Sequence, residues 1–317
     1  MSVVDPSPPA LAPASLRARW LQRTAHLSPT ARALLWSLAS GLLFSLLNSL
    51  SRVLTQQLHP MQMQFLRYAF GLLVLLPFVA HAGLAAYRPQ RLGGQFLRGA
   101  LHTLGLILWF TALPRIPLAD MTAIGFTGPI FILLGAWLFL KEPMRWERWA
   151  ATLAGFLGVL VVVGPRLSGS GGGWHLMMLA SAPVFAASFL LTKALTRSET
   201  SQVIVFWQSV SVTLFSLPLA LPYWQSPSGW QWLGYAACGV LGTAGHYCLT
   251  QSYRHADISA TQSLRFLDLV WASALGLMIF GDLPTLTTLA GGAIIAVATI
   301  WLARRESRTL AKADAEP

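Results

Sequence analysis

Three charged side chains stand inside long apolar stretches of this sequence, where a charge is kept only at a cost. Arg265 and Asp268 are three positions apart, so in a helix they share a face and can pair, whereas Arg67 stands alone in an earlier stretch. A charge in a membrane interior costs about 2.5 to 3.5 kcal/mol on insertion scales. One interpretation is structural: the pair neutralises itself, and Arg67 extends to the membrane surface. The other is a binding site, in which the arginines hold a carboxylate or phosphate and Asp268 holds an amine or a proton.

Two histidines extend this set toward proton chemistry. His102 and His246 fall in apolar stretches at comparable places in the two halves of the chain. Because imidazole titrates near neutral pH, these histidines and Asp268 are the candidates for proton coupling, and a buried histidine satisfied by a neighbour is the alternative. Neutral polar groups and flat rings supply hydrogen bonds and stacking surfaces, or serve as packing contacts between helices. The further candidates for substrate binding are Asn48, Gln208, Gln262, Trp109, Trp271 and His246.

Metal, cofactor and nucleotide chemistry find no support in the sequence. Cys238 and Cys248 lie in one apolar stretch without the spacing of metal ligands. No Gly-x-x-x-x-Gly-Lys loop is present to bind ATP. We therefore predict no metal and no cofactor, and uphill movement of a solute must draw on a gradient.

The elements that position these residues must be membrane-spanning helices. Hydrophobic residues make up 55% of the 317 residues and charged residues 10%, where a soluble domain carries about 25% charged residues. Apolar runs of about 20 residues recur along the chain, each long enough to cross a hydrocarbon core of roughly 30 Å. The net charge of +11 comes from basic residues spread singly between these runs, so nucleic acid is not an expected partner. The fold class predicted is an all-α integral membrane protein, with the lipid bilayer as its surroundings.

About ten transmembrane helices follow from the runs and from the Pro and Gly residues between them. The predicted spans are 33–54, 60–80, 95–113, 118–140, 147–164, 174–195, 202–222, 231–252, 258–280 and 285–303. Most Lys and Arg residues, Arg98 among them, fall in segments that are cytoplasmic if the N-terminus is inside, whereas Arg52, Arg115 and Arg166 fall on the other side. Both termini are therefore predicted to be cytoplasmic.

The two halves of the chain repeat each other. Phe65-Leu66-Arg67 corresponds to Phe206-Trp207-Gln208, and Glu142 corresponds to Asp282, at a nearly constant offset. Five spans in each half turn the second copy upside down in the membrane, an arrangement typical of carriers that alternate access around a site near the midplane. The predicted organisation is a disordered cytosolic tail over 1–30, a first five-helix repeat over 31–165, a Gly/Ser linker over 166–173, a second repeat over 174–303 and a cytosolic tail over 304–317.

Several short motifs follow one another in the order of a known family. They are Phe65-Leu66-Arg67-Tyr68, Thr111-Ala112-Leu113, Pro117-Leu118-Ala119, Gly128-Pro129, Leu138-Phe139-Leu140-Lys141-Glu142, Ala154-Gly155-Phe156-Leu157-Gly158-Val159 and, in the second half, Phe280-Gly281-Asp282-Leu283-Pro284. This order resembles the EamA-type repeat of the drug/metabolite transporter superfamily, although Asp282 stands where the family usually has Glu and Leu269 where a proline is common. The resemblance implies two inverted EamA-like repeats, a central cavity lined from both halves, and a place in the bacterial inner membrane.

These observations predict a secondary-active carrier that works by alternating access and exports a small polar or zwitterionic metabolite, such as an amino acid derivative or an amino-acid-derived metallophore. An importer of a vitamin or nucleoside-like metabolite, of the riboflavin or S-adenosylmethionine type, is the first alternative. A membrane-embedded enzyme on a lipid-linked substrate is the second, although the short loops lack the clustered His, Asp or Glu that such chemistry needs. Small residues on the spans suit packing within one chain and between two, so a homodimer stays open.

Overall fold

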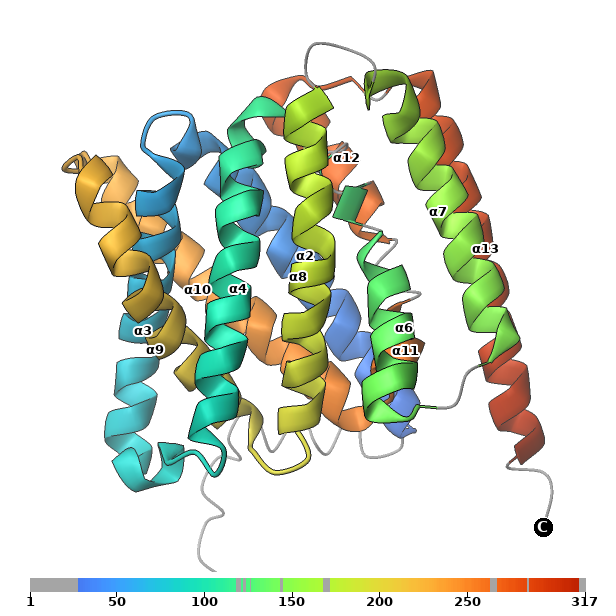
Figure 1. Cartoon of the computed structure of the whole chain (residues 1–317), viewed down its shortest axis with the longest axis horizontal. Helices are drawn as coiled ribbons and strands as arrows, with labels where there is room; N and C mark the ends of the chain where they lie inside the picture. Colours follow the sequence, from blue (N-terminus) through green and yellow to red (C-terminus); the bar gives the residue numbers. More distant parts are fainter. Residues whose placement is uncertain are drawn as a thin grey trace, which may run out of the picture.

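The computed structural model describes residues 28–117, 121, 124–125, 127–142, 145–167, 172–262, 267–283 and 285–313. In these parts the regular secondary structure is helical (Figure 1). The helices of the first half are α2 (Pro29–Thr55), α3 (Pro60–Ala82), η1 (Leu84–Tyr87), α4 (Leu92–Ala112), η2 (Leu113–Arg115), α6 (Gly128–Leu140) and α7 (Trp146–Leu167). Those of the second half are α8 (Gly172–Leu195), α9 (Ser201–Ala220), η3 (Leu221–Tyr223), α10 (Gly229–His255), α11 (Ile258–Thr261), α12 (Leu267–Phe280) and α13 (Leu286–Ala313).

The prediction of an all-helical membrane protein is confirmed. Five helices are long and apolar enough to cross a membrane by length and composition, namely α2, α3, α4 continued by η2, α8, and α9 continued by η3. Helix starts follow capping chemistry: Ser28 caps α2 before Pro29, and Ser228 with Gln231 forms a capping box on α10. At the other end of the chain, α13 continues to Ala313, ten residues past the predicted end of the last span.

Helix packing shows the two repeats directly. The first-half helix α2 packs on the second-half helix α10, and its counterpart α8 packs on α4. In the same way α3 packs on α10 as α9 packs on α4, and α12 packs on α2 as α6 packs on α8. The equivalent helices α3 and α9 pair with each other at one edge of the bundle, and α7 and α13 pair at the other (Figure 1). In Figure 1, α2 and α4 run upward whereas their counterparts α8 and α10 run downward. The halves are therefore related by an inverted, approximately two-fold arrangement.

The fourth span of the first half is not the continuous helix that was predicted over 118–140. Thr127 lies in a turn and α6 begins only at Gly128, because Pro129 has no backbone N–H and its ring disfavours helical backbone in the residue before it. At 1.5 Å per residue, its 13 residues extend only about 20 Å. The equivalent span of the second half is described as two helices, α11 and α12, on either side of residues 263–266, which lie outside the described residues. Interrupted spans of this kind border the binding sites of many carriers.

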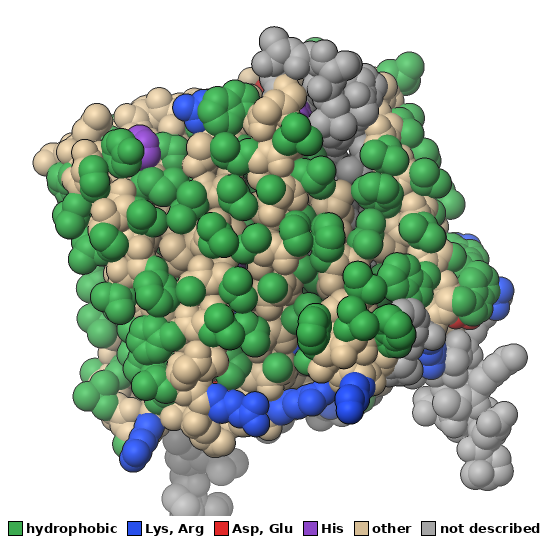
Figure 2. Space-filling model, in the orientation of Figure 1, with side chains coloured by type: hydrophobic (Ala, Val, Ile, Leu, Met, Phe, Trp, Pro, Cys, Tyr) green, Lys and Arg blue, Asp and Glu red, His purple; other side chains and the backbone are tan. Residues whose placement is uncertain are grey.

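The flank of the bundle is apolar and one end is basic. Figure 2 shows hydrophobic side chains over the visible flank and a band of Lys and Arg along the lower edge. Exposed basic residues of that kind include Arg88, Arg91 and Arg197. The start of α2 and the end of α13 also lie toward this lower face in Figure 1. The molecule is therefore a multi-pass membrane protein with a basic end, and this asymmetry is what the positive-inside rule uses for orientation.

A glycine contact sets how closely α3 and α10 approach. A Cβ added at Gly239 would lie 2.7 Å from the main-chain carbonyl carbon of Phe70. We expect Gly239→Ala to push these helices apart and to lower the free energy of unfolding by about 1 to 3 kcal/mol. The measurement is thermal unfolding of the purified protein in detergent. Gly229→Ala is the matched control on the same helix, because nothing lies within 4 Å of an added Cβ there, and an equal loss in both variants would contradict the prediction.

Candidate binding cavity

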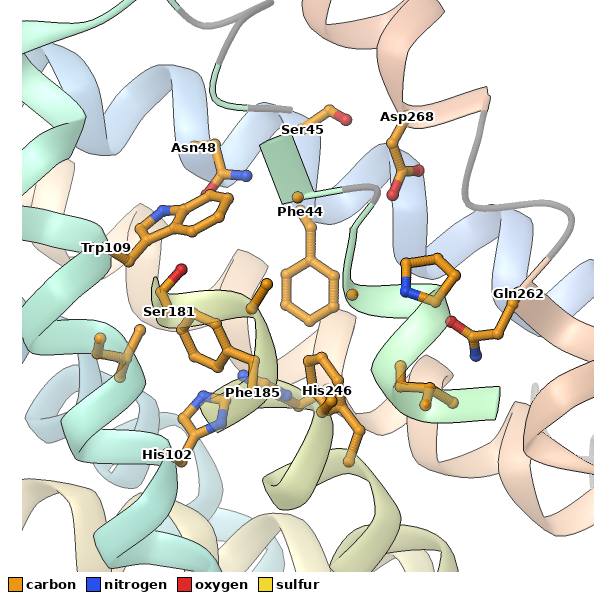
Figure 3. A pocket seen from close by; sticks show the side chains of 18 of the residues that line it. Phe44, Ser45, Asn48, His102, Trp109, Ser181, Phe185, His246, Gln262 and Asp268 are labelled. Carbon is orange, nitrogen blue, oxygen red and sulfur yellow. The ribbon is translucent and has the colours of Figure 1, made fainter. Parts of the chain in front are cut away.

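A cavity lies between the two halves, in the middle of the bundle (Figure 3), and the empty space in it, together with the open solvent at its mouth, is about 1010 Å³. Helices α2, α3, α4 and α6 supply its wall from the first half, and α8, α10, α12 and Gln262 supply it from the second. Seven of the residues predicted from the sequence line it: Asn48, Arg67, His102, Trp109, His246, Gln262 and Asp268.

Arg67 brings a permanent positive charge to the cavity. Its side chain is 6% exposed, so the interpretation in which it extends to the outer surface is wrong. The guanidinium stacks over the Tyr68 ring at 4.9 Å and packs against Gly242, where an added Cβ would lie 3.1 Å from Nε. Among the described residues, neither a carboxylate nor a hydrogen-bond acceptor contacts it. A buried guanidinium in this position is suited to bind an anionic group of a ligand.

Asp268 brings the opposite charge to the same cavity. It lies in the first turn of α12, where the helix dipole favours a carboxylate, and its carboxylate rests against Gly41 of α2. In Figure 3 it points into the space above Gln262. Its predicted partner Arg265 lies outside the described residues, so their pairing stays a prediction.

The two histidines meet in a polar layer at the base of the cavity. The ring centroids of His102 and His246 are 5.1 Å apart. Nδ1 of His102 is 3.2 Å from the Ser188 hydroxyl, and Nε2 of His246 is 3.1 Å from the Tyr68 hydroxyl and 3.3 Å from Nε2 of Gln208. All five side chains are buried. Each histidine therefore has a polar neighbour at one ring nitrogen, as the structural alternative required, and each also lines the cavity.

Arg98 is the residue of this layer that the sequence placed wrongly. It was assigned to the cytoplasmic segments, yet its side chain is 1% exposed inside α4. The guanidinium donates to Oγ1 of Thr192 at 2.6 Å, to the carbonyl of Ile204 at 3.0 Å and to Oε1 of Gln208 at 2.6 Å. Its spacing of four from His102 puts both residues on one helix face, and this was the signal available in the sequence.

Aromatic side chains complete the wall. Trp109 and Phe185 pack edge to face at 5.9 Å, and Phe185 stacks on Phe189 at 6.1 Å. Phe44 packs its edge against His246 at 4.9 Å. These rings offer flat, polarisable surfaces for a ring or a cation of a ligand.

Two predicted residues, Gln208 and Trp271, do not line the cavity. Gln208 stands behind the histidines, where it binds Arg98 and does not line the main cavity. Trp271 is likewise outside the lining. Gln262 reaches the cavity, and its Nε2 donates to the carbonyl of Ile258 while its Oε1 is buried without a donor among the described residues.

The segment between α10 and α11 is held at both ends by repeat-related charges. Glu142 accepts hydrogen bonds from the backbone N–H groups of Ile258 and Ser259, at 3.2 and 3.4 Å, and from the Ser259 hydroxyl at 2.6 Å. Lys193 donates to the carbonyls of Tyr253 and Ala256, both at 2.8 Å.

At the opposite end of the bundle, the equivalent residues Arg52 and Asp282 form an ion pair with each other. No ion pair joins Lys193 to Glu142 in the part of the chain that the structure describes. Equivalent charges at the two ends of the bundle therefore have different partners in this conformation.

An all-helical bundle of two inverted repeats around one charged and aromatic cavity defines a class of protein, the membrane transporters. The sequence matches the EamA-like transporter family over residues 31–164 and again over 172–304. The chain belongs to this family, which lies in the drug/metabolite transporter superfamily. It is accordingly a transporter of a small molecule, and the membrane-enzyme alternative is dropped.

Individual relatives carry different molecules. The chain is 35% identical over 278 residues to a riboflavin transporter of Rhizobium johnstonii, covering 86% of this chain and 91% of the relative. It is 30% identical over 280 residues to an S-adenosylmethionine uptake transporter of Rickettsia felis (87% and 94% covered). It is 29% identical over 262 residues to the pseudopaline exporter CntI of Pseudomonas aeruginosa (82% and 92% covered). A solved crystal structure with a TM-score of 0.71 and 19% identity covers 88% of this chain and 99% of its own, and it supports the fold.

Proposed function

We propose that this protein is a secondary-active carrier of a zwitterionic, amino-acid-derived metabolite that bears a flat ring or a cation. The observation that carries the proposal is the presence of Arg67, Asp268 and the aromatic wall in one cavity. Arg67 would hold a carboxylate and Asp268 an ammonium group, while Trp109 and Phe185 would stack on the remainder of the molecule. S-adenosylmethionine and pseudopaline, named for two relatives, both belong to this chemical class.

The second candidate is uptake of a neutral vitamin of the riboflavin type. The relative at 35% identity carries riboflavin, and the rings of the cavity wall suit a flat heterocycle. A neutral cargo leaves the charges of Arg67 and Asp268 unused, which is why we place it second. Export, the direction predicted from the sequence, stays a prediction, because the named relatives work in both directions.

The proposal includes the place of the protein in the cell. We propose the bacterial inner membrane with both termini in the cytoplasm, so that the basic lower end in Figure 2 faces inward. Alternating access would exchange the two ends of the inverted repeat, powered by a gradient of protons or of the cargo itself. A homodimer through the exposed faces of the helices also stays a prediction.

Flux into and out of proteoliposomes tests the cargo class. We expect saturable movement of labelled S-adenosylmethionine across vesicles that hold the purified protein, inhibited by other zwitterionic ring compounds and much less by riboflavin. Protein-free vesicles are the control for leakage. Movement of riboflavin with no movement of the zwitterion would favour the second candidate, and movement of neither would contradict the proposed class.

A further inference from the structure

Arg98 fixes which way the side-chain amide of Gln208 points. A guanidinium carries five N–H donors, no acceptor and a permanent charge. Its Nη2 lies 2.6 Å from Gln208 Oε1, so the oxygen of the amide must face Arg98. The NH₂ group of Gln208 then faces the other way, 3.3 Å from Nε2 of His246 and 3.5 Å from the Tyr68 hydroxyl. Rotating the amide would set its N–H groups against the guanidinium.

This orientation sets which kind of hydrogen bond Gln208 can make with His246. The amide of Gln208 donates toward Nε2, and this hydrogen bond requires the Nε2 lone pair, which places the proton of a neutral imidazole on Nδ1. The Tyr68 hydroxyl is also 3.1 Å from Nε2, but a hydroxyl can rotate and change from donor to acceptor. Gln208 cannot reverse in this way while Arg98 holds its oxygen.

We propose that His246 is the group that takes up a proton during transport, and that Arg98 is a positioning residue that makes this protonation incompatible with the present contact between the halves. A proton from water would add to the Nε2 lone pair and give an imidazolium. The new Nε2–H would then face an N–H group of Gln208 across 3.3 Å, and the Tyr68 hydroxyl at 3.1 Å would be its acceptor, so the hydrogen bond from Gln208 to His246 would be lost. Since Arg98 lies on α4 of the first half and Gln208 on α9 of the second, separation of α4 from α9 relieves the conflict. Protonation therefore favours a conformation in which the halves have moved, which is the coupling that a proton-driven carrier needs.

The charges around His246 link the proton to the cargo, and this step rests on the proposed function. Both arginines oppose an imidazolium, so a cargo carboxylate on Arg67 would reduce this opposition and make protonation easier. The wall residues of α2 and α8 nearest to it, Phe44 and Phe189, do not titrate. Among the described residues, the titratable and charged groups around His246 include Arg67 and Tyr68 from α3, Arg98 and His102 from α4, and Asp268 from α12.

Histidine titration in the intact protein tests the inference without any cargo. We would follow the imidazole nitrogens of ¹⁵N-histidine-labelled protein in nanodiscs by NMR, with His246→Gln to identify the signal. In the wild type we expect the lone pair on Nε2 at neutral pH. In Gln208→Glu the new carboxylate accepts from both Arg98 and His246, so His246 should take up its proton at a pH higher by about one unit or more.

The control variant is Gln251→Glu, which adds the same charge on α10 but beside the Tyr247 hydroxyl, 2.7 Å from Nε2 of Gln251. It should leave the titration of His246 close to that of the wild type. Transport in proteoliposomes supplies the second readout: the pH dependence of flux should move with the titration of His246 in Gln208→Glu.

Three results would overturn the inference: a wild-type His246 with its proton on Nε2, an unchanged titration in folded Gln208→Glu, or a shifted titration with an unchanged pH dependence of flux. The first two do not depend on which molecule is carried. A wrong cargo assignment is therefore distinguishable from a wrong role for Arg98 and His246.

Discussion

Arg67→Ala should weaken transport of a carboxylate-bearing cargo by about 10-fold to 150-fold. A hydrogen bond to a charged group contributes about 1.5 to 3 kcal/mol, and each 1.4 kcal/mol is tenfold in affinity. The described residues provide no hydrogen-bond partner for this guanidinium, so its removal leaves no buried acceptor of the protein unsatisfied. The loss should therefore appear in binding and flux and much less in stability. Flux of S-adenosylmethionine and of its decarboxylated analogue, each measured over a range of concentrations, checks this.

The comparison of two cargoes makes the prediction specific to Arg67. The wild type should prefer S-adenosylmethionine over the decarboxylated compound, and Arg67→Ala should carry both about equally. The two proteins and two cargoes form a double-mutant-type cycle, which isolates the pairing of guanidinium and carboxylate. Arg88→Ala is the matched control, since Arg88 is exposed at the basic end of the bundle. A preference for the carboxylate that survives in Arg67→Ala would assign the anion to another group.

Glu142→Ala should lower the free energy of unfolding by about 3 kcal/mol and reduce transport as well. The buried carboxylate accepts from two backbone N–H groups and one hydroxyl at the start of α11, and each orphaned donor costs about 1 to 3 kcal/mol, partly offset by relaxation. Arg148 of α7 donates to the same Ser259 hydroxyl at 2.6 Å, so loss of Glu142 should also weaken the contact between α7 and α11. Unfolding in detergent, monitored by tryptophan fluorescence, measures the stability.

Two variants bracket this effect. Glu142→Gln keeps one acceptor oxygen and should lose about half as much stability as the alanine variant. Glu147→Ala removes the same charge five positions further on, from a partly exposed place in the first turn of α7, and should change stability little. If Glu142→Ala unfolds at the wild-type temperature, the carboxylate is not what holds α11 at its start.

The sequence predicts most of the architecture because apolar length is a strong signal. The helical spans follow from apolar length, the repeat and the family follow from matched motifs in a constant order, and Pro129 marks the place where the fourth span is interrupted. What it could not supply is the turn at Thr127 before α6 begins at Gly128, because a break in a membrane helix is stabilised by its neighbours in space. The end of α13 was also missed, because the residues after 303 are too polar to be counted as part of a membrane span, although they are helical.

Site residues were predictable where a polar group interrupts an apolar run. They were less predictable where the sequence must show which face of an apolar helix lines the cavity. Arg67, Asp268 and both histidines are exceptions to their surroundings, and all of them line the cavity. Trp271 does not, because α12 is apolar on every side and its inward face cannot be read from periodicity. Arg98 was not predicted as a site residue, because a basic residue near a predicted span boundary is assigned to the loops whose charge sets the membrane orientation.

Arg98 also sets the order in which the protein can be completed in its membrane. Its three acceptors belong to Thr192, Ile204 and Gln208, all of which leave the ribosome about a hundred residues later than α4. Until α8 and α9 are inserted, this guanidinium has none of its final partners, and the first repeat carries an uncompensated cation in the bilayer. Although the two halves repeat one pattern, the hydrogen bonds of Arg98 in the first half form only after the second half has been inserted.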